Sequence, residues 1–119
     1  MIVCVPSEGE KGLDAPVAEH FGRAPTYTLF DTTTNGVRVI ANGGKHNGGN
    51  GTATEHLLKE NVEVVIAGGL GPKAVEMMKN KGIRVFVGAQ GTVCETINLW
   101  MKGRLQRATL ENACKDHEN

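Results

Sequence analysis

The sequence has few cysteines, no surplus of charge and no long hydrophobic run. Its three cysteines are an odd number and lie far apart, so they do not make a disulfide framework, and a reducing cytoplasm is the expected setting. The formal net charge of +0 argues against a dedicated nucleic-acid-binding protein, which would normally carry a basic surplus. No apolar stretch approaches the roughly 20 residues that span a bilayer. No basic leader with a cleavage site comes before the first apolar run, so we expect neither a membrane protein nor an exported one.

Enzyme motifs are also missing. The sequence contains no Ser-His-Asp arrangement, no Walker motif and no HExxH helix. The basic, amphipathic stretch at residues 76–84 is most simply a solvated helix face. The sequence therefore favours a binding protein over an enzyme.

Glycine, in contrast, is abundant, with 16 copies that concentrate in the predicted loops. These loops separate segments with the composition of β-strands, first at residues 2–6, 26–31 and 37–41. An Asn-Gly pair between the second and third segments predicts a tight turn between antiparallel neighbours. Two later segments, 62–67 and 83–87, are rich in β-branched residues and are predicted to be buried parallel strands.

Helix signals alternate with the later strands. Residues 52–55 and 92–95 each match a capping box, in which a threonine and a glutamate satisfy each other's free backbone amides at a helix start. Between these two helices, Pro72 opens another helix and Gly82 closes it. The predicted order β-β-β-α-β-α-β-α indicates an α/β domain with a mixed five-stranded sheet and helices on its faces.

A single domain is expected over residues 1–105, followed by a polar C-terminal tail at residues 106–119. Two connections in the domain are too long to be simple links, namely residues 7–25 and the glycine-rich residues 42–51. Long irregular segments in a compact domain are usually functional or mobile. We therefore look for a binding site in the loops.

The first long connection ends in the hexapeptide HFGRAP at residues 20–25. The imidazole of His20 is a suitable ligand for iron and related metals. The guanidinium of Arg23 could offset the charge of an anionic ligand, and the adjacent Gly22 belongs to the same candidate site. The alternative is structural: His20 would cap a turn, Phe21 would fill the core and Arg23 would be solvated.

A second candidate is the glycine turn at residues 68–72, between a buried strand and a helix. Gly69 and Gly71 allow the backbone to approach a ligand, and the helix that begins at Pro72 offers free amides with a partial positive charge. A phosphate, a carboxylate or the sulfide face of a metal cluster could bind there. The turn fits neither GxGxxG nor a P-loop, and a tight turn without a ligand is the alternative.

The remaining donors carry weaker signals. His46, in the glycine-rich connection, could fold over a ligand as a second donor, or could face solvent. Cys114 and His117 form a CxxH pair that could ligate a metal, although two donors fall short of a closed four-ligand site. Cys4 is expected to be a small buried hydrophobic residue, and Cys94 a buried flank of the last helix.

Four separated segments occur together, and in this order, in a known family. They are the hexapeptide at residues 20–25 with the following Asp31, GxGT at 49–52, VVIAGGLGP at 64–72 and the helix start at 91–93. In these segments the chain resembles the dinitrogenase iron–molybdenum cofactor biosynthesis family, whose members are of the nitrogenase accessory factor type. The resemblance runs from about residue 2 to residue 105.

The resemblance implies a ribonuclease-H-like, three-layer α/β fold. It also implies binding of an iron–sulfur or iron–molybdenum type cluster by a carrier or assembly accessory, rather than by an enzyme. Such a carrier takes a cluster from a donor protein and passes it to an acceptor protein. In the family pattern the cluster ligand falls on His20.

Two other functions remain open from the sequence. A small regulatory module could hold a phosphate-bearing metabolite at the helix start of Gly71 and Pro72. A nuclease-like enzyme ranks last, because the first strand carries Cys4 where a ribonuclease would need an acidic residue.

Overall fold

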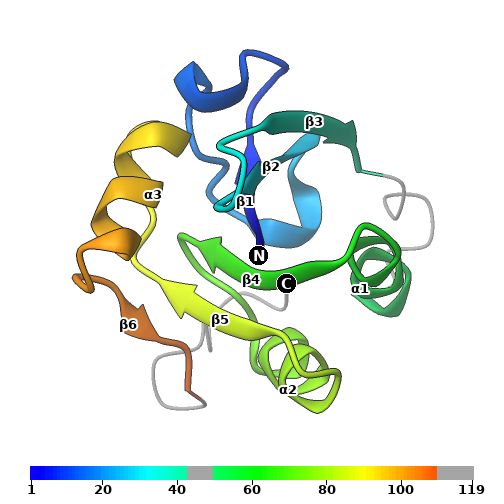
Figure 1. Ribbon diagram of the computed structural model, residues 1–119. Coiled ribbons are helices and arrows are strands. Elements are labelled where there is room, and N and C mark those ends of the chain that lie inside the picture. Colours follow the sequence, from blue (N-terminus) through cyan, green and yellow to red (C-terminus); the bar gives the residue numbers. More distant parts are fainter. Residues whose placement is uncertain (43–49, 110–119) are drawn as a thin grey trace.

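The computed structural model of the chain describes residues 1–42 and 50–109, which form an α/β fold (Figure 1). Within these residues a six-stranded mixed sheet has the order β3-β2-β1-β4-β5-β6. The strands are β1 (Ile2–Ser7), β2 (Thr26–Asp31), β3 (Val37–Ala41), β4 (Val62–Ala67), β5 (Arg84–Val87) and β6 (Gln106–Arg107). The helices are α1 (Asn50–Lys59), α2 (Pro72–Asn80) and α3 (Val93–Met101), with 3₁₀ turns η1 (Gly12–Asp14) and η2 (Phe21–Arg23).

The sheet combines an antiparallel meander with parallel crossovers. Strands β1, β2 and β3 are antiparallel neighbours, and Asn35 takes a left-handed φ of 62° in the turn that the Asn-Gly pair predicted. Strands β1, β4 and β5 are parallel, as expected for buried strands joined through helices. Their carboxyl ends therefore lie at the same edge of the sheet.

The prediction of five strands is wrong, because β6 adds an antiparallel sixth strand beside β5. The chain reverses at Gly103, whose φ is +71°, and returns along β5. The Ala108 amide then donates to the Val85 carbonyl at 2.8 Å, and Ala108 is buried. A strand of two residues has too short a pattern for sequence periodicity to detect. It comprises the first residues of the segment expected to be a polar tail.

Helices cover both faces of the sheet (Figure 1). One apolar cluster contains Leu57 of α1 and Met78 of α2, packed against strand residues such as Val65. The other contains Val93 and Ile97 of α3 on the opposite face. In the described part of the chain, no helix is long and apolar enough to cross a membrane.

Two of the three predicted helix starts are confirmed. Helix α2 begins at Pro72 and is followed by Gly82 with φ +81°. Helix α3 has the capping box: the Glu95 amide donates to Thr92 Oγ1 at 3.2 Å, and the Thr92 amide donates to Glu95 Oε1 at 2.9 Å. The prediction that α1 is capped at Thr52 is wrong, because the helix already begins at Asn50. The low helix propensity of glycine suggested that the residues before Thr52 form a loop. Local propensity is a weak guide to the residue at which a helix begins.

Candidate functional site

A cavity of about 410 Å³ lies where the loops after three parallel strands meet. In sheets of this kind, ligands bind in the crevice outside the carboxyl ends of the strands. The loop after β1 contributes Val17, Ala18, Glu19 and His20; the loop after β4 contributes Gly68 and Gly69; and the loop after β5 contributes Ala89, Gln90 and Gly91. The cavity therefore brings together His20 and Gly69, two residues from separate candidate segments.

Backbone pairing holds the three loops together. His20 and Gly69 form a parallel β-bridge, which joins the loop after β1 to the loop after β4. The Val17 amide donates to the Gly91 carbonyl at 2.9 Å and so joins the first loop to the loop after β5. The Ala89 amide donates to the Ala67 carbonyl at 3.2 Å. The cavity wall is thus built from mutually bonded backbone, not from isolated loops.

Gly68 lies close to the backbone of both neighbouring loops. A Cβ atom at this position would lie 3.3 Å from the carbonyl oxygen of Ala89 and 3.4 Å from that of Glu19. Such contacts are tight, and both neighbours are backbone. A larger residue here would push the loops apart, so this glycine is needed for the shape of the cavity.

His20 is half-buried at the cavity wall, directly before η2. The next residue, Phe21, is buried, and its ring centroid lies 5.0 Å from that of Tyr27. The Tyr27 hydroxyl also donates to the Phe21 carbonyl at 3.0 Å. Phe21 in the core and an exposed Arg23 match the structural alternative for this segment, and His20 is the N-cap residue of η2 without a side-chain cap hydrogen bond. The burial of Phe21 fixes the backbone that carries His20.

Asn42 is a residue of the site that sequence reasoning missed. Its buried side-chain Nδ2 donates to the Gly22 carbonyl at 3.1 Å and to the Ala24 carbonyl at 2.8 Å. Its backbone amide donates to the Pro25 carbonyl at 3.1 Å. Asn42 therefore clamps the hexapeptide that carries His20. Its position before a glycine-rich segment suggested only a turn.

The cavity does not include all of the candidate residues. Gly22 is half-buried, Arg23 is exposed at the end of η2, Gly71 is buried and Pro72 is half-buried, and none of the four lines the cavity. Gly71 is the N-cap of α2, and its carbonyl accepts from the Val75 amide at 3.1 Å. Three further candidates, His46, Cys114 and His117, lie outside the described residues.

Two cysteines of the described chain are reduced and lie away from the cavity. Burial raises the pKa of the Cys4 thiol far above its usual range, so Cys4 is a neutral core group, as predicted. Cys94 is half-buried instead of buried, and Asn98 Nδ2 lies 3.8 Å from its sulfur. Neither thiol belongs to the wall that holds His20.

The donor set suits a bulky ligand with few protein bonds. Small residues form much of the wall, and His20 contributes the imidazole among the lining residues. Over residues 1–42 and 50–109, no group of three or more His, Cys, Asp and Glu could hold a metal ion. The exposed Glu19 adds a carboxylate, which repels an anionic ligand.

A second, shallower groove of about 520 Å³ continues from the cavity. The two share Gln90 and Gly91, and the groove then follows one face of α3 through Glu95 and Asn98 to Lys102. Sequence reasoning missed the loop after β5 as a wall of the site. Gly88 and Gly91, with φ values of +100° and +79°, were the available signal that the backbone bends there.

Comparisons with known proteins agree with the resemblance seen in the sequence. The family model described as dinitrogenase iron-molybdenum cofactor matches residues 1–103. A comparison with curated proteins gives no match. The solved apo form of the orange protein from Desulfovibrio gigas has a TM-score of 0.84 at 29% sequence identity, over 91% of this chain and 92% of that chain. A Thermotoga protein of the DUF35 family, provisionally assigned as a NifB protein, has a TM-score of 0.81 at 31% identity, over 98% of both chains.

Proposed function

Because the chain belongs to the dinitrogenase iron–molybdenum cofactor family, we propose that it binds an iron–sulfur or iron–molybdenum type cluster as cargo and carries it between proteins. The observation that supports the proposal is the cavity where His20 and Gly69 meet the loop after β5. Family membership associates the chain with the iron–molybdenum cofactor. Binding of a cluster in this cavity is the step that we add.

The small number of donors suits a carrier. A cluster held by one imidazole, with backbone amides of the cavity wall offsetting part of its charge, can leave for a partner with little loss of protein bonds. Ligation by four cysteines would retain it. His20 is therefore proposed as the ligand and Gly69 as anion support, because both line the cavity. Gly22, Arg23, Gly71 and Pro72 lie outside the cavity wall and have no direct contact with the cargo in this proposal.

The proposed role is that of an accessory, not a catalyst. Its partners are a protein that donates the cluster and a protein that accepts it, and the reducing cytoplasm is the expected setting, because the described thiols are free. We also propose that the architecture is ribonuclease-H-like. The antiparallel β3-β2-β1 meander followed by the parallel strands β4 and β5 supports this assignment.

The test is anaerobic reconstitution of the whole chain with ferrous iron, sulfide and molybdate. Protein is separated from free metal, and bound metal and visible absorbance are measured. Wild type should gain cluster absorbance, and His20→Ala should lose most of it. His56→Ala is the matched control, because His56 lies on α1, outside the residues that line the cavity. Retention of all absorbance by His20→Ala would overturn the proposed ligand, and no gain by wild type would overturn the function.

A further inference from the structure

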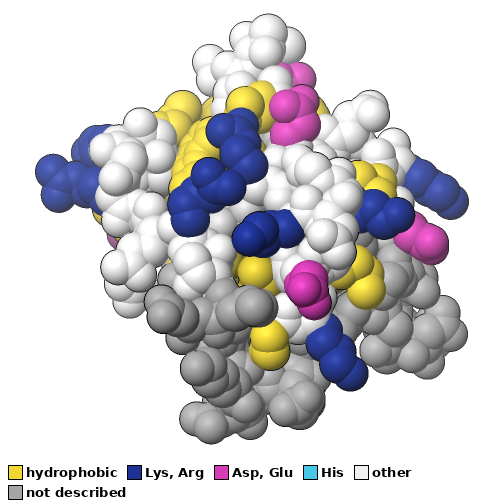
Figure 2. Space-filling view, turned by 90° about the horizontal axis from the view of Figure 1, so that it is seen from below, with side chains coloured by type: hydrophobic (Ala, Val, Ile, Leu, Met, Phe, Trp, Pro, Cys, Tyr) yellow, Lys and Arg dark blue, Asp and Glu magenta, His cyan; other side chains and the backbone are white. Residues whose placement is uncertain are grey.

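The net charge of +0 hides an uneven distribution along the chain. Residues 1–71 carry five Lys and Arg against eight Asp and Glu, a net charge of −3. Residues 72–107 carry seven Lys and Arg against two Glu, a net charge of +5. The second segment includes α2, β5, α3 and β6. Lys and Arg side chains cluster over hydrophobic ones, with few Asp and Glu, on the side of the molecule where α2, β5 and β6 lie (Figure 2).

Part of this charge lies over an aromatic pair at the β6 edge of the sheet. Arg107 of β6 is the register partner of Phe86 of β5, and its guanidinium carbon lies 5.7 Å from the Phe86 ring centroid. The other neighbour of Phe86 is Trp100 of α3, at 6.3 Å between ring centroids in an edge-to-face arrangement. The contact between an arginine and an aromatic ring holds the guanidinium in place over the Phe86 ring.

The end of α3 extends the same region. Met101 is 54% exposed, more than Met1 or Val37, the other exposed large hydrophobic residues of the described chain. Lys102 and Arg104 follow and are exposed. The Arg104 amide donates to the Leu99 carbonyl at 2.9 Å, so the turn after the helix is ordered by backbone bonds. We call these residues the β6-edge surface: Arg84, Trp100, Met101, Lys102, Arg104 and Arg107.

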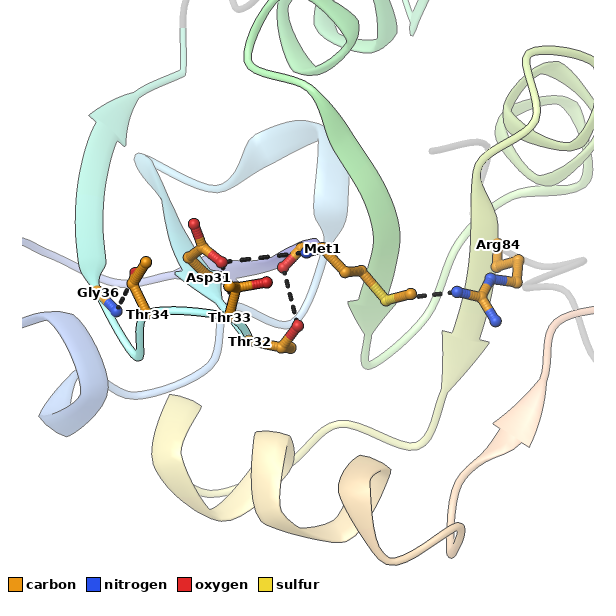
Figure 3. A network of polar contacts seen from close by, with 7 residues as sticks. All are labelled: Met1, Asp31, Thr32, Thr33, Thr34, Gly36 and Arg84. Atoms are coloured by element: carbon orange, nitrogen blue, oxygen red, sulfur yellow. Dashed lines mark hydrogen bonds and ion pairs between the residues drawn. The ribbon is translucent and has the colours of Figure 1, made fainter.

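Three cations of this surface lack acidic partners within the described chain. Arg84, Lys102 and Arg104 form no ion pair with any described residue. Arg84 instead points its Nη2 toward the sulfur of Met1 at 3.3 Å (Figure 3). The amine of Met1 lies 4.0 Å from an Asp31 oxygen, so the nearby carboxylate already has a cation beside it. These three side chains are exposed, and no carboxylate of the described chain neutralises their charge.

We propose that the β6-edge surface is a docking site for an acidic protein partner. Arginine, tryptophan and methionine are enriched in protein interfaces, and complementary charge speeds and orients encounter. An acidic protein fits better than a nucleic acid, because Met101 and Trp100 offer apolar contact area beside the cations. The β6-edge surface is inferred from its charges, contacts and exposure. Only the identification of the partner as a cluster donor or acceptor rests on the proposed function.

The experiment uses the whole chain without added iron or sulfide, so its result does not depend on cluster binding. The probe is a short amphipathic peptide with glutamates on one face and leucines on the other. Binding is followed by the fluorescence of Trp100, the single tryptophan, and by amide chemical shifts. We expect shift changes at Arg84 and at residues 100–107. The same peptide with glutamine in place of glutamate should bind at least about tenfold more weakly.

Charge reversal tests the surface. The triple variant Lys102→Glu, Arg104→Glu, Arg107→Glu should lose at least about tenfold in affinity for the peptide. Arg104→Glu alone should lose less, and it keeps the ring contact of Arg107 if the triple variant fails to fold. Met101→Ser should weaken binding by about threefold, since it removes apolar contact area.

The matched control reverses the same number of positive charges outside the β6-edge surface. Lys59→Glu, Lys73→Glu, Lys79→Glu reverses three cations on α1 and α2 and should change affinity by less than about twofold. An equal loss in this control would overturn the proposal, as would shift changes confined to α2. Tighter binding of a short DNA duplex than of the peptide would assign the surface to nucleic acid instead and would also overturn it.

Discussion

The backbone of His20 pairs with that of Gly69 in a parallel β-bridge, so the loop after β1 lies against the loop after β4. This pairing sets the imidazole that we propose as a cluster ligand beside two glycines on one cavity wall. It depends on the sheet order, in which β1 and β4 are parallel neighbours. Changes in either loop should therefore affect the packing of the loops and the loading of a cluster together.

Glu19 should weaken the binding of an anionic cluster. Its carboxylate lines the cavity that His20 shares, and like charges repel across a short distance. Glu19→Gln should therefore raise the affinity for a reconstituted cluster by about two- to fivefold, a small effect because the group is exposed. Equilibrium competition with an iron chelator measures it. Glu10→Gln, an exposed change outside the cavity, should have no effect, and equal behaviour of the two variants would contradict the prediction.

Gly68→Ala should damage the cavity more than the fold. The new Cβ would meet the Ala89 and Glu19 carbonyls at 3.3 and 3.4 Å, so the loops must separate. We expect a loss of about 1–3 kcal/mol in the free energy of unfolding, together with a large loss of cluster loading. Urea denaturation and metal analysis measure the two effects.

The control for this variant is Gly82→Ala. Gly82 has φ +81°, and a Cβ added there would meet no atom within 4 Å, so alanine costs about 1–2 kcal/mol of backbone strain without a steric clash. It precedes β5, at the edge of the sheet opposite the cavity. Its cluster loading should stay at the wild-type level; a parallel loss in both variants would indicate that lowered stability, not cavity shape, limits loading.

The sequence predicted local features of the fold well. The Asn-Gly turn, the helix start at Pro72 and the capping box of Thr92 and Glu95 each depend on a few adjacent residues, and the structure confirms all three. Strand β6 could not be predicted, because a strand of two residues is too short to show the alternation of apolar and polar side chains. Its existence depends on β5 being available as a partner.

The candidate site was predictable only in part, for a similar reason. His20 and Gly69 were found because imidazole and glycine have clear chemical uses. The clamp by Asn42 was missed because its acceptors, the carbonyls of Gly22 and Ala24, are defined by the fold and not by residue type. Glu19 and Gln90 became part of the site only when the loops met.

Asn42→Ala should loosen the hexapeptide that carries His20. The variant leaves the carbonyls of Gly22 and Ala24 without their buried donor, which should cost about 1–3 kcal/mol in the free energy of unfolding. Amide hydrogen exchange of residues 20–25 should also speed up. Asn98→Ala is the control, since the Asn98 side chain makes only a weak, exposed contact with the Cys94 sulfur at 3.8 Å. If the amides of residues 20–25 exchange at equal rates in the two variants, Asn42 does not hold the hexapeptide in place.

Cys4 should make the protein less stable at alkaline pH. Burial raises the pKa of its thiol, so the folded state keeps the proton while the unfolded chain loses it above about pH 8.5. The unfolded state then binds fewer protons, and the free energy of unfolding falls by up to about 1.4 kcal/mol per pH unit as the pH rises further. Below about pH 8.5 the contribution is fully present. Urea denaturation at a series of pH values measures the slope.

Two cysteine variants separate this thiol from other alkaline titrations. Burial, and secondarily the charge of Cys4, raise the pKa of the Tyr27 hydroxyl, which acts in the same direction but only above about pH 10. Between about pH 8 and pH 9.5, Cys4→Ala should therefore flatten the slope, although the cavity it creates lowers stability at every pH. Cys94→Ala, which removes a half-buried thiol on α3, should keep the wild-type slope. If Cys94→Ala flattens the slope and Cys4→Ala does not, the alkaline sensitivity comes from the helix surface and not from the core of the sheet.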